Sequence, residues 1–160
     1  MGFAIGSNPT QPSATALTDG KGFNPGDQIE DGSGNVWVYV KASAAITQYD
    51  TVTYDETFIT TVTPLTTSNA ARGDKLGVAS VAFASGDYGF LQIYGPCTMN
   101  VAASCAPNAQ LTATSVAGVL DDATTASLIV ADAIYTTAAS ASVAASKAGV
   151  LNWPAVGSTL

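Results

Sequence analysis

Few residues of this chain are of the types that perform covalent chemistry. The sequence contains no histidine and two cysteines, Cys97 and Cys105. Without histidine the chain lacks the commonest general base and metal ligand, and two thiols alone cannot complete a zinc site. A local disulfide and a pair of buried reduced thiols both stay open, the second being the commoner state. We therefore predict no metal, no cofactor and no enzymatic activity.

The stretch 27–35 is the most ligand-like part of the sequence, because it offers several oxygens among flexible glycines. A calcium loop can be built in this way. However, Val36 stands where an EF-hand beginning at Asp31 needs glycine, and no glutamate closes the loop. A solvated β-turn before a strand is the favoured interpretation.

Acidic side chains also occur as neighbours, in Asp55-Glu56 and Asp121-Asp122. Adjacent residues of a strand point to opposite faces, so neither doublet is expected to form an acid–base pair. A catalytic pair assembled from Asp74 and Asp87 is the remaining enzymatic alternative, and it would make the chain a small carboxylate-dependent hydrolase.

Charge is scarce and mostly negative. Lys and Arg number 5 against 12 Asp and Glu, which gives a net charge of −7, and charged residues make up 11% of the 160 residues, where about 25% is usual. This balance argues against electrostatic binding to nucleic acid or to an anionic membrane. No apolar run reaches the roughly 18 residues of a membrane span, and the N-terminus does not resemble a secretion signal. A structural or binding role is expected.

Residues 1–35 differ in composition and pattern from the rest of the chain. They are rich in proline and glycine and lack a periodic apolar pattern. Such a segment is predicted to be an extended N-terminal arm. It is either a mobile tail or an arm that orders when its apolar anchors dock on a partner. The anchors are Phe3, Ile5, Leu17 and Phe23.

Residues 36–160 are predicted to form an all-β domain, a small sandwich or barrel of short strands. Residues 36–40 alternate valine with aromatic residues, and residues 76–83 and 88–95 read as a hairpin closed by a turn at 85–87. Pro96 is expected to end the second of these strands. Further strands are expected at 49–54, 57–65, 98–101, 110–114, 118–120, 127–134 and 150–153, and the Ala-rich stretch 138–148 is the one helical candidate.

Two segments, 41–53 and 102–112, resemble each other. Setting Ile46 against Cys105 brings Val52 opposite Leu111, and each segment reads as a small-residue connector, a turn and a new strand. Either the chain contains an internal duplication, or the likeness is a chance product of Ala- and Thr-rich sequence.

Aromatic residues gather in the central β region. Most should pair within the core or on a sheet surface, but aromatic residues are also enriched where subunits meet. We expect a homo-oligomer, although a carbohydrate-binding platform would have a similar composition. The candidate interface residues are Trp37, Tyr39, Tyr88, Phe90 and Tyr94.

Residues 75–95 resemble the small capsid decoration (cement) proteins and related head proteins of tailed bacteriophages. The likeness lies in Leu76-Gly77-Val78-Ala79, the turn at 85–87, and the aliphatic strand that ends at Gly95. It implies a β-rich, commonly trimeric protein that sits at local threefold positions of the shell and clamps neighbouring major capsid subunits, often through an N-terminal arm.

On this resemblance the chain is expected to be a non-enzymatic virion structural protein. It would be made in the bacterial host cytoplasm, form a homotrimer, and bind the major capsid protein on the outer surface of the capsid. The arm anchors would contact the capsid. An alternative is a head-fibre or tail-associated virion module that binds a host surface glycan.

Overall fold

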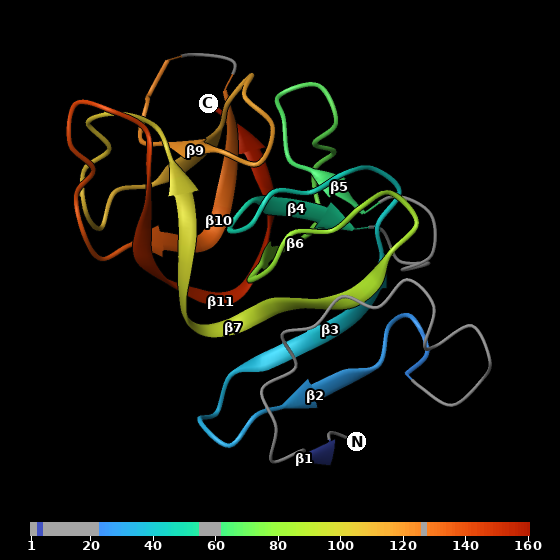
Figure 1. The fold of residues 1–160 in the computed structure, drawn as a ribbon. Helices are drawn as coiled ribbons and strands as arrows, with labels where there is room; N and C mark the ends of the chain where they lie inside the picture. The colour runs from blue at the N-terminus through green and yellow to red at the C-terminus, as the bar shows by residue number, and fades with distance from the viewer. Residues whose placement is uncertain (1–2, 5–22, 55–61, 126–127) are drawn as a thin grey trace.

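The computed structural model describes residues 3–4, 23–54, 62–125 and 128–160, and within these ranges the chain is all β with no helix. The described strands belong to one sheet (Figure 1). They are β1 (Phe3–Ala4), β2 (Gln28–Glu30), β3 (Val36–Lys41), β4 (Thr51–Tyr54), β5 (Thr63–Pro64), β6 (Lys75–Ala79), β7 (Tyr88–Val101), β8 (Leu111–Ala113), β9 (Leu120–Asp121), β10 (Ile129–Thr136) and β11 (Ala145–Thr159).

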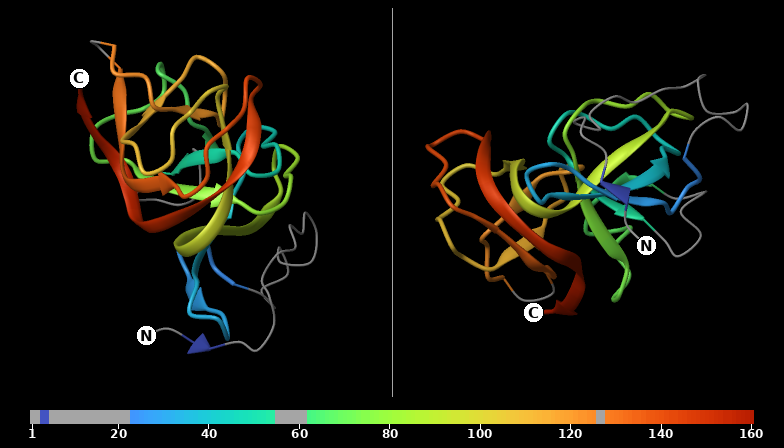
Figure 2. Two further views of the ribbon diagram at one scale, coloured as in Figure 1. Left: turned by 90° about the vertical axis from the view of Figure 1, so that its left-hand side faces the viewer. Right: turned by 90° about the horizontal axis from the view of Figure 1, so that it is seen from below.

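The sheet closes twice, so the chain forms two small barrels. In the first, β3 pairs with β7, β7 with β6, β6 with β4 and β4 with β5, and a bridge between Ala42 and Val62 completes the ring. In the second, β7, β9, β8, β10 and β11 pair in that order, and β11 returns to β7. The long strand β7 is common to both, and Figure 2 (right) shows the two barrels side by side.

The two barrels repeat the same local structure. The alignment that sets Ile46 against Cys105 also sets Tyr49 against Asn108, and both of these residues have a positive φ, 70° and 58°. The Tyr49 N–H donates to the carbonyl oxygen of Ala79, and the Asn108 N–H donates to that of Thr136. In each barrel, this hydrogen bond joins the segment that follows the barrel's first strand to the last residue of a later strand of the same barrel.

The closing contacts of the barrels correspond as well. A parallel bridge joins Ala42 to Val62 in the first barrel, and a parallel pairing joins Val101 to Leu120 in the second. The strands that follow, β4 and β8, each pair antiparallel with the next two strands of their own barrel. Chance similarity of composition does not produce matched long-range hydrogen bonds, so the structure favours internal duplication.

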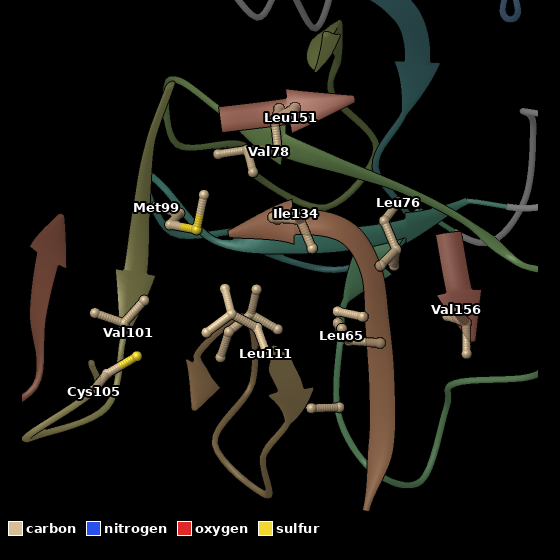
Figure 3. Packing of buried hydrophobic residues seen from close by; sticks show 13 residues of the cluster. Leu65, Leu76, Val78, Met99, Val101, Cys105, Leu111, Ile134, Leu151 and Val156 are labelled. Carbon is tan, nitrogen blue, oxygen red and sulfur yellow. The ribbon is translucent and has the colours of Figure 1, made fainter. Parts of the chain in front are cut away.

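Each barrel surrounds its own apolar core. The core of the first barrel includes Val38, Val40, Val52, Leu91 and Ile93. The core of the second is shown in Figure 3 and also takes in Leu76 and Val78 from β6 of the first barrel, and Leu65 from the residue that follows β5. Because full burial of one such side chain contributes about 1.5–3 kcal/mol, these shared contacts tie the barrels together.

The hairpin predicted over 76–95 is confirmed, since Val78 pairs with Gln92 and Ala79 with Leu91. The prediction that Pro96 ends the second strand is wrong. The strand continues because it changes partners, from β3 up to Tyr94 to β11 beyond it. Within the described residues no strand flanks the other side of β7 at Pro96, so the missing N–H costs no ladder bond.

The helical prediction for 138–148 is also wrong. Residues 145–148 begin β11 and pair with residues 98–101 of β7, while 138–144 connect β10 to β11. Alanine favours helix only weakly in a segment that also carries serine and valine, and tertiary pairing decides such cases.

The boundary predicted at residue 36 falls inside a hairpin. Gln28–Glu30 pair with Val36–Val38, and β1 pairs parallel with β2. Phe23 packs its ring against Tyr39 and Phe90, with centroids 5.7 and 4.9 Å apart. Residues 28–30 are therefore part of the sheet, and Phe23 packs against its aromatic cluster.

Candidate functional site

Both cysteines carry free thiols. Cys97 lies on β7 opposite Gly149, and burial raises the pKa of its thiol to about 12. The pKa of Cys105 is raised by burial and by the negative charges of Asp122 and Asp121. The thiolate is the reactive form of cysteine, so both side chains are poor nucleophiles at neutral pH.

Cys105, Asp121 and Asp122 form the one described cluster whose ligand atoms lie within 4.8 Å of one another. The expectation that the two carboxylates point to opposite faces is wrong, because β9 ends at Asp121 and Asp122 lies beyond the strand. Asp122 accepts from the Ala106 N–H at 2.9 Å, and Asp121 accepts from the Asp122 N–H at 2.9 Å. Both carboxylates therefore already accept hydrogen bonds from backbone N–H groups of this chain.

As a metal centre this cluster would be poorly matched. It offers one thiol whose pKa is raised and two carboxylates, a mixture of soft and hard ligands. The pKa of Asp121 is raised by burial and by the neighbouring Asp122 carboxylate. The arrangement holds the segment after β9 against Ala106 and shows no further feature of a metal site.

The segment that resembled a calcium loop is a β-turn. The Asp31 carboxylate accepts hydrogen bonds from the Ser33 N–H (2.8 Å), the Asn35 N–H (3.0 Å), the Asn35 side-chain amide (2.8 Å) and Trp37 Nε1 (3.1 Å). Burial opposes the charged form, but the bonds from Asn35, Ser33 and Trp37 outweigh it, and the pKa of Asp31 is lowered. The carboxylate holds the turn that joins β2 to β3.

Asp74 and Asp87, the enzymatic alternative, each hold a turn of their own. Asp74 accepts from the Ala71 N–H at 3.0 Å and Asp87 from the Ala84 N–H at 2.8 Å. In each turn the aspartate N–H also donates back to the carbonyl oxygen three residues earlier. This geometry accounts for both residues without catalysis.

Three of the five candidate interface residues lie inside the molecule. Trp37, Tyr39 and Phe90 are buried and, with Ile29, form a small cluster between β2, β3 and β7. Tyr88 is half-buried and stacks on Tyr39 with centroids 6.1 Å apart. Tyr94 is 40% exposed, so among the five it alone presents a large part of its ring to solvent.

The candidate arm anchors are less completely described. Phe3 lies in β1, and Phe23 is docked on the chain's own aromatic cluster. Ile5 and Leu17 lie outside the described residues. The capsid-contact role of the four residues stays a prediction.

Sequence reasoning missed Trp153, which proves to be the most exposed aromatic side chain of the described residues at 51%. Its ring pairs with that of Tyr94, with centroids 6.1 Å apart. Trp153 also lines a groove of about 480 Å³, together with Asp27, Gln28 and Glu30. Periodicity placed Trp153 at the end of an expected strand, but it could not show which face would remain uncovered.

Comparison of the chain with protein-family models, with curated proteins and with solved structures finds no match in any of the three. Among the described residues, no helix is long and apolar enough to cross a membrane.

Proposed function

We propose that this chain is a virion structural protein that decorates the outer surface of a bacteriophage capsid. It binds the lattice of the major capsid protein, associates as a homotrimer and strengthens the head without catalysing a reaction. Support comes from the resemblance of residues 75–95 to decoration proteins. These residues lie in β6, the following loop and the first half of β7, the hairpin at the centre of the first barrel.

The observation that carries the proposal is the end of the sheet at β1, beyond which no further strand pairs among the described residues. Both barrels are closed rings of strands, whereas β2 and β1 extend from β3 outside the first barrel (Figure 2, left). An open edge offers backbone N–H and C=O groups to an extended segment of another protein. The N-terminal part of the chain is thus where the molecule is best built to join a partner's sheet.

Binding to an assembled lattice would stabilise that lattice by mass action. A protein that binds neighbouring capsid subunits together, and binds free subunits less well, favours the assembled state by its binding free energy. Many copies on one shell would add their contributions. This role needs an interaction surface rather than a catalytic centre.

Deleting residues 1–22 tests the proposal. This deletion removes β1 but keeps Phe23 on its aromatic cluster, so both barrels should stay folded. We expect the truncated protein to keep its thermal unfolding midpoint and lose attachment to shells assembled without the decoration protein, as measured by co-sedimentation and electron microscopy.

The full-length chain with residues 1–22 in scrambled order is the matched control, and it should also fail to attach. Full attachment of the folded, truncated protein would show that the N-terminal segment is not the capsid-binding element. If neither the full-length protein nor the truncation binds shells, the decoration role itself is wrong.

A further inference from the structure

Two aromatic rings remain uncovered where the barrels meet the N-terminal hairpin. Tyr94 is on β7 and pairs with Asn152 of β11, next to Trp153. The rings of Tyr94 and Trp153 lie with centroids 6.1 Å apart at an angle of 37° and are 40% and 51% exposed. Large aromatic side chains usually bury most of their surface, so an exposed pair indicates a surface for contact.

The backbone holds Trp153 in this position at a cost. The register of β10 and β11 shifts between the Ile134–Leu151 and Asp132–Ala155 pairs, so that Trp153 and its two neighbours stand opposite Ala133 alone. Trp153 has a φ of 56° and Ala133 a φ of 59°. A positive φ is strained for a bulky residue, and β-bulges commonly redirect a side chain at a functional position.

The groove beside Trp153 is lined for the rest by the N-terminal hairpin, which contributes two acidic side chains and one amide. Asp27, Gln28 and Glu30 line it from the N-terminal hairpin, and Val36 adds an apolar contact. No lysine or arginine is among the described lining residues. The carboxylates and the amide can accept and donate hydrogen bonds, whereas an anionic ligand would be repelled.

A volume of about 480 Å³ is within the usual range for a small-molecule site. An exposed flat ring and hydrogen-bonding side chains in one groove match a pyranose, which has an apolar C–H face and a rim of hydroxyl groups. We propose that the Trp153 groove binds a neutral saccharide, with one sugar ring stacked on Trp153 and its hydroxyls bonded to Gln28 and Glu30. This site does not depend on the capsid-binding role.

Trp153 and Tyr94 provide the test. Binding of cellopentaose and chitopentaose to the full-length protein can be followed by tryptophan fluorescence and by isothermal titration calorimetry. Trp37 is buried, so a change in emission on binding reports on Trp153. We expect dissociation constants on the order of 1 mM for at least one of the two oligosaccharides, and no binding of the anionic polymer polygalacturonate.

The Trp153→Ala variant should weaken binding at least about 10-fold, since stacking on an aromatic ring carries much of such an interaction. Trp153→Tyr should restore part of the affinity. Tyr135→Ala is the matched control, because Tyr135 is also 40% exposed but lies outside this groove. Its affinity should equal that of the unaltered protein, and all variants should keep their unfolding midpoint.

Three results would overturn the inference. They are the absence of binding by either oligosaccharide at about ten times the expected dissociation constant, binding that is unchanged in folded Trp153→Ala, and loss of trimerisation or of shell attachment in that variant. The last result would identify the exposed rings as a protein interface. The deletion of residues 1–22 tests the capsid role separately.

Discussion

At the scale of single residues, the aspartates that the sequence offered as candidate ligands or catalytic groups mainly accept hydrogen bonds from backbone N–H groups. Four of them, Asp27, Asp50, Asp74 and Asp87, accept a hydrogen bond from the N–H three residues earlier. The residue before each has a positive φ, and it is a glycine in every case except Tyr49. A short acidic side chain after a left-handed residue thus closes a tight turn. Their position in turns was predictable, but their hydrogen-bond partners required the folded chain.

Asp31 gives a prediction about pH. Its pKa is lowered in the folded protein, so its stabilising effect is present above the unfolded pKa of about 3.9 and is lost as the pH falls through the folded pKa. We expect Asp31→Asn to lower the free energy of unfolding by about 0.5–1 kcal/mol at pH 7, since the carboxylate is partly screened by solvent, and by less at pH 3. Urea denaturation at the two pH values measures the difference, and an equal loss at both would contradict the role given to the charge.

At the scale of elements, β7 decides the architecture. Its first half belongs to one barrel and its second half to the other, with the change of partner near Gly95, which has a φ of 98°. The buried Gln92 amide donates to the carbonyl oxygens of Tyr94 and Pro96 at 3.1 and 2.7 Å, which satisfies the backbone at this bend. The alternation of apolar residues predicted two strands here instead of one long strand. A change of pairing partner within a strand leaves no signal in the local sequence.

A substitution at Gly149 tests how closely β11 is packed in the second barrel. A Cβ added at Gly149 would contact Met99 Cε and lie 2.7 Å from the backbone oxygen of Tyr135. We expect Gly149→Ala to lower the free energy of unfolding by about 2–3 kcal/mol, because backbone has to shift. Gly32→Ala, where no atom lies within 4 Å, is the control and should change stability by less than about 0.5 kcal/mol. Equal effects would show that β11 can move away.

At the scale of the whole molecule, two similar barrels share one strand and adjoining cores. The second core includes Leu76 and Val78 from β6 of the first barrel, and Leu65, which directly follows β5. A duplicated unit that keeps a separate core can unfold separately, whereas shared buried contacts couple the two halves. The barrel class was predictable from short strands and turns, but the duplication was left open because Ala- and Thr-rich segments resemble one another by chance.

Val52 and Leu111 occupy matching positions in the two barrels and are both fully buried. We expect Val52→Ala and Leu111→Ala to lower the free energy of unfolding by about 1–4 kcal/mol and to shift the same single transition. Calorimetry and urea denaturation followed by tryptophan fluorescence and circular dichroism should agree for each variant. Two separate transitions, each sensitive to one substitution, would show that the barrels unfold independently.

Local patterns were enough to predict strands, turns and the all-β class, because alternation and turn-forming residues act over a few positions. Distant contacts determined the rest. Trp37, Tyr39 and Phe90 are buried while Tyr94 and Trp153 are exposed, although all five are aromatic residues in strands. Which face of a strand is covered depends on the segment that packs on it, and that segment can lie more than a hundred residues away, as Asp27 and Trp153 do in one groove.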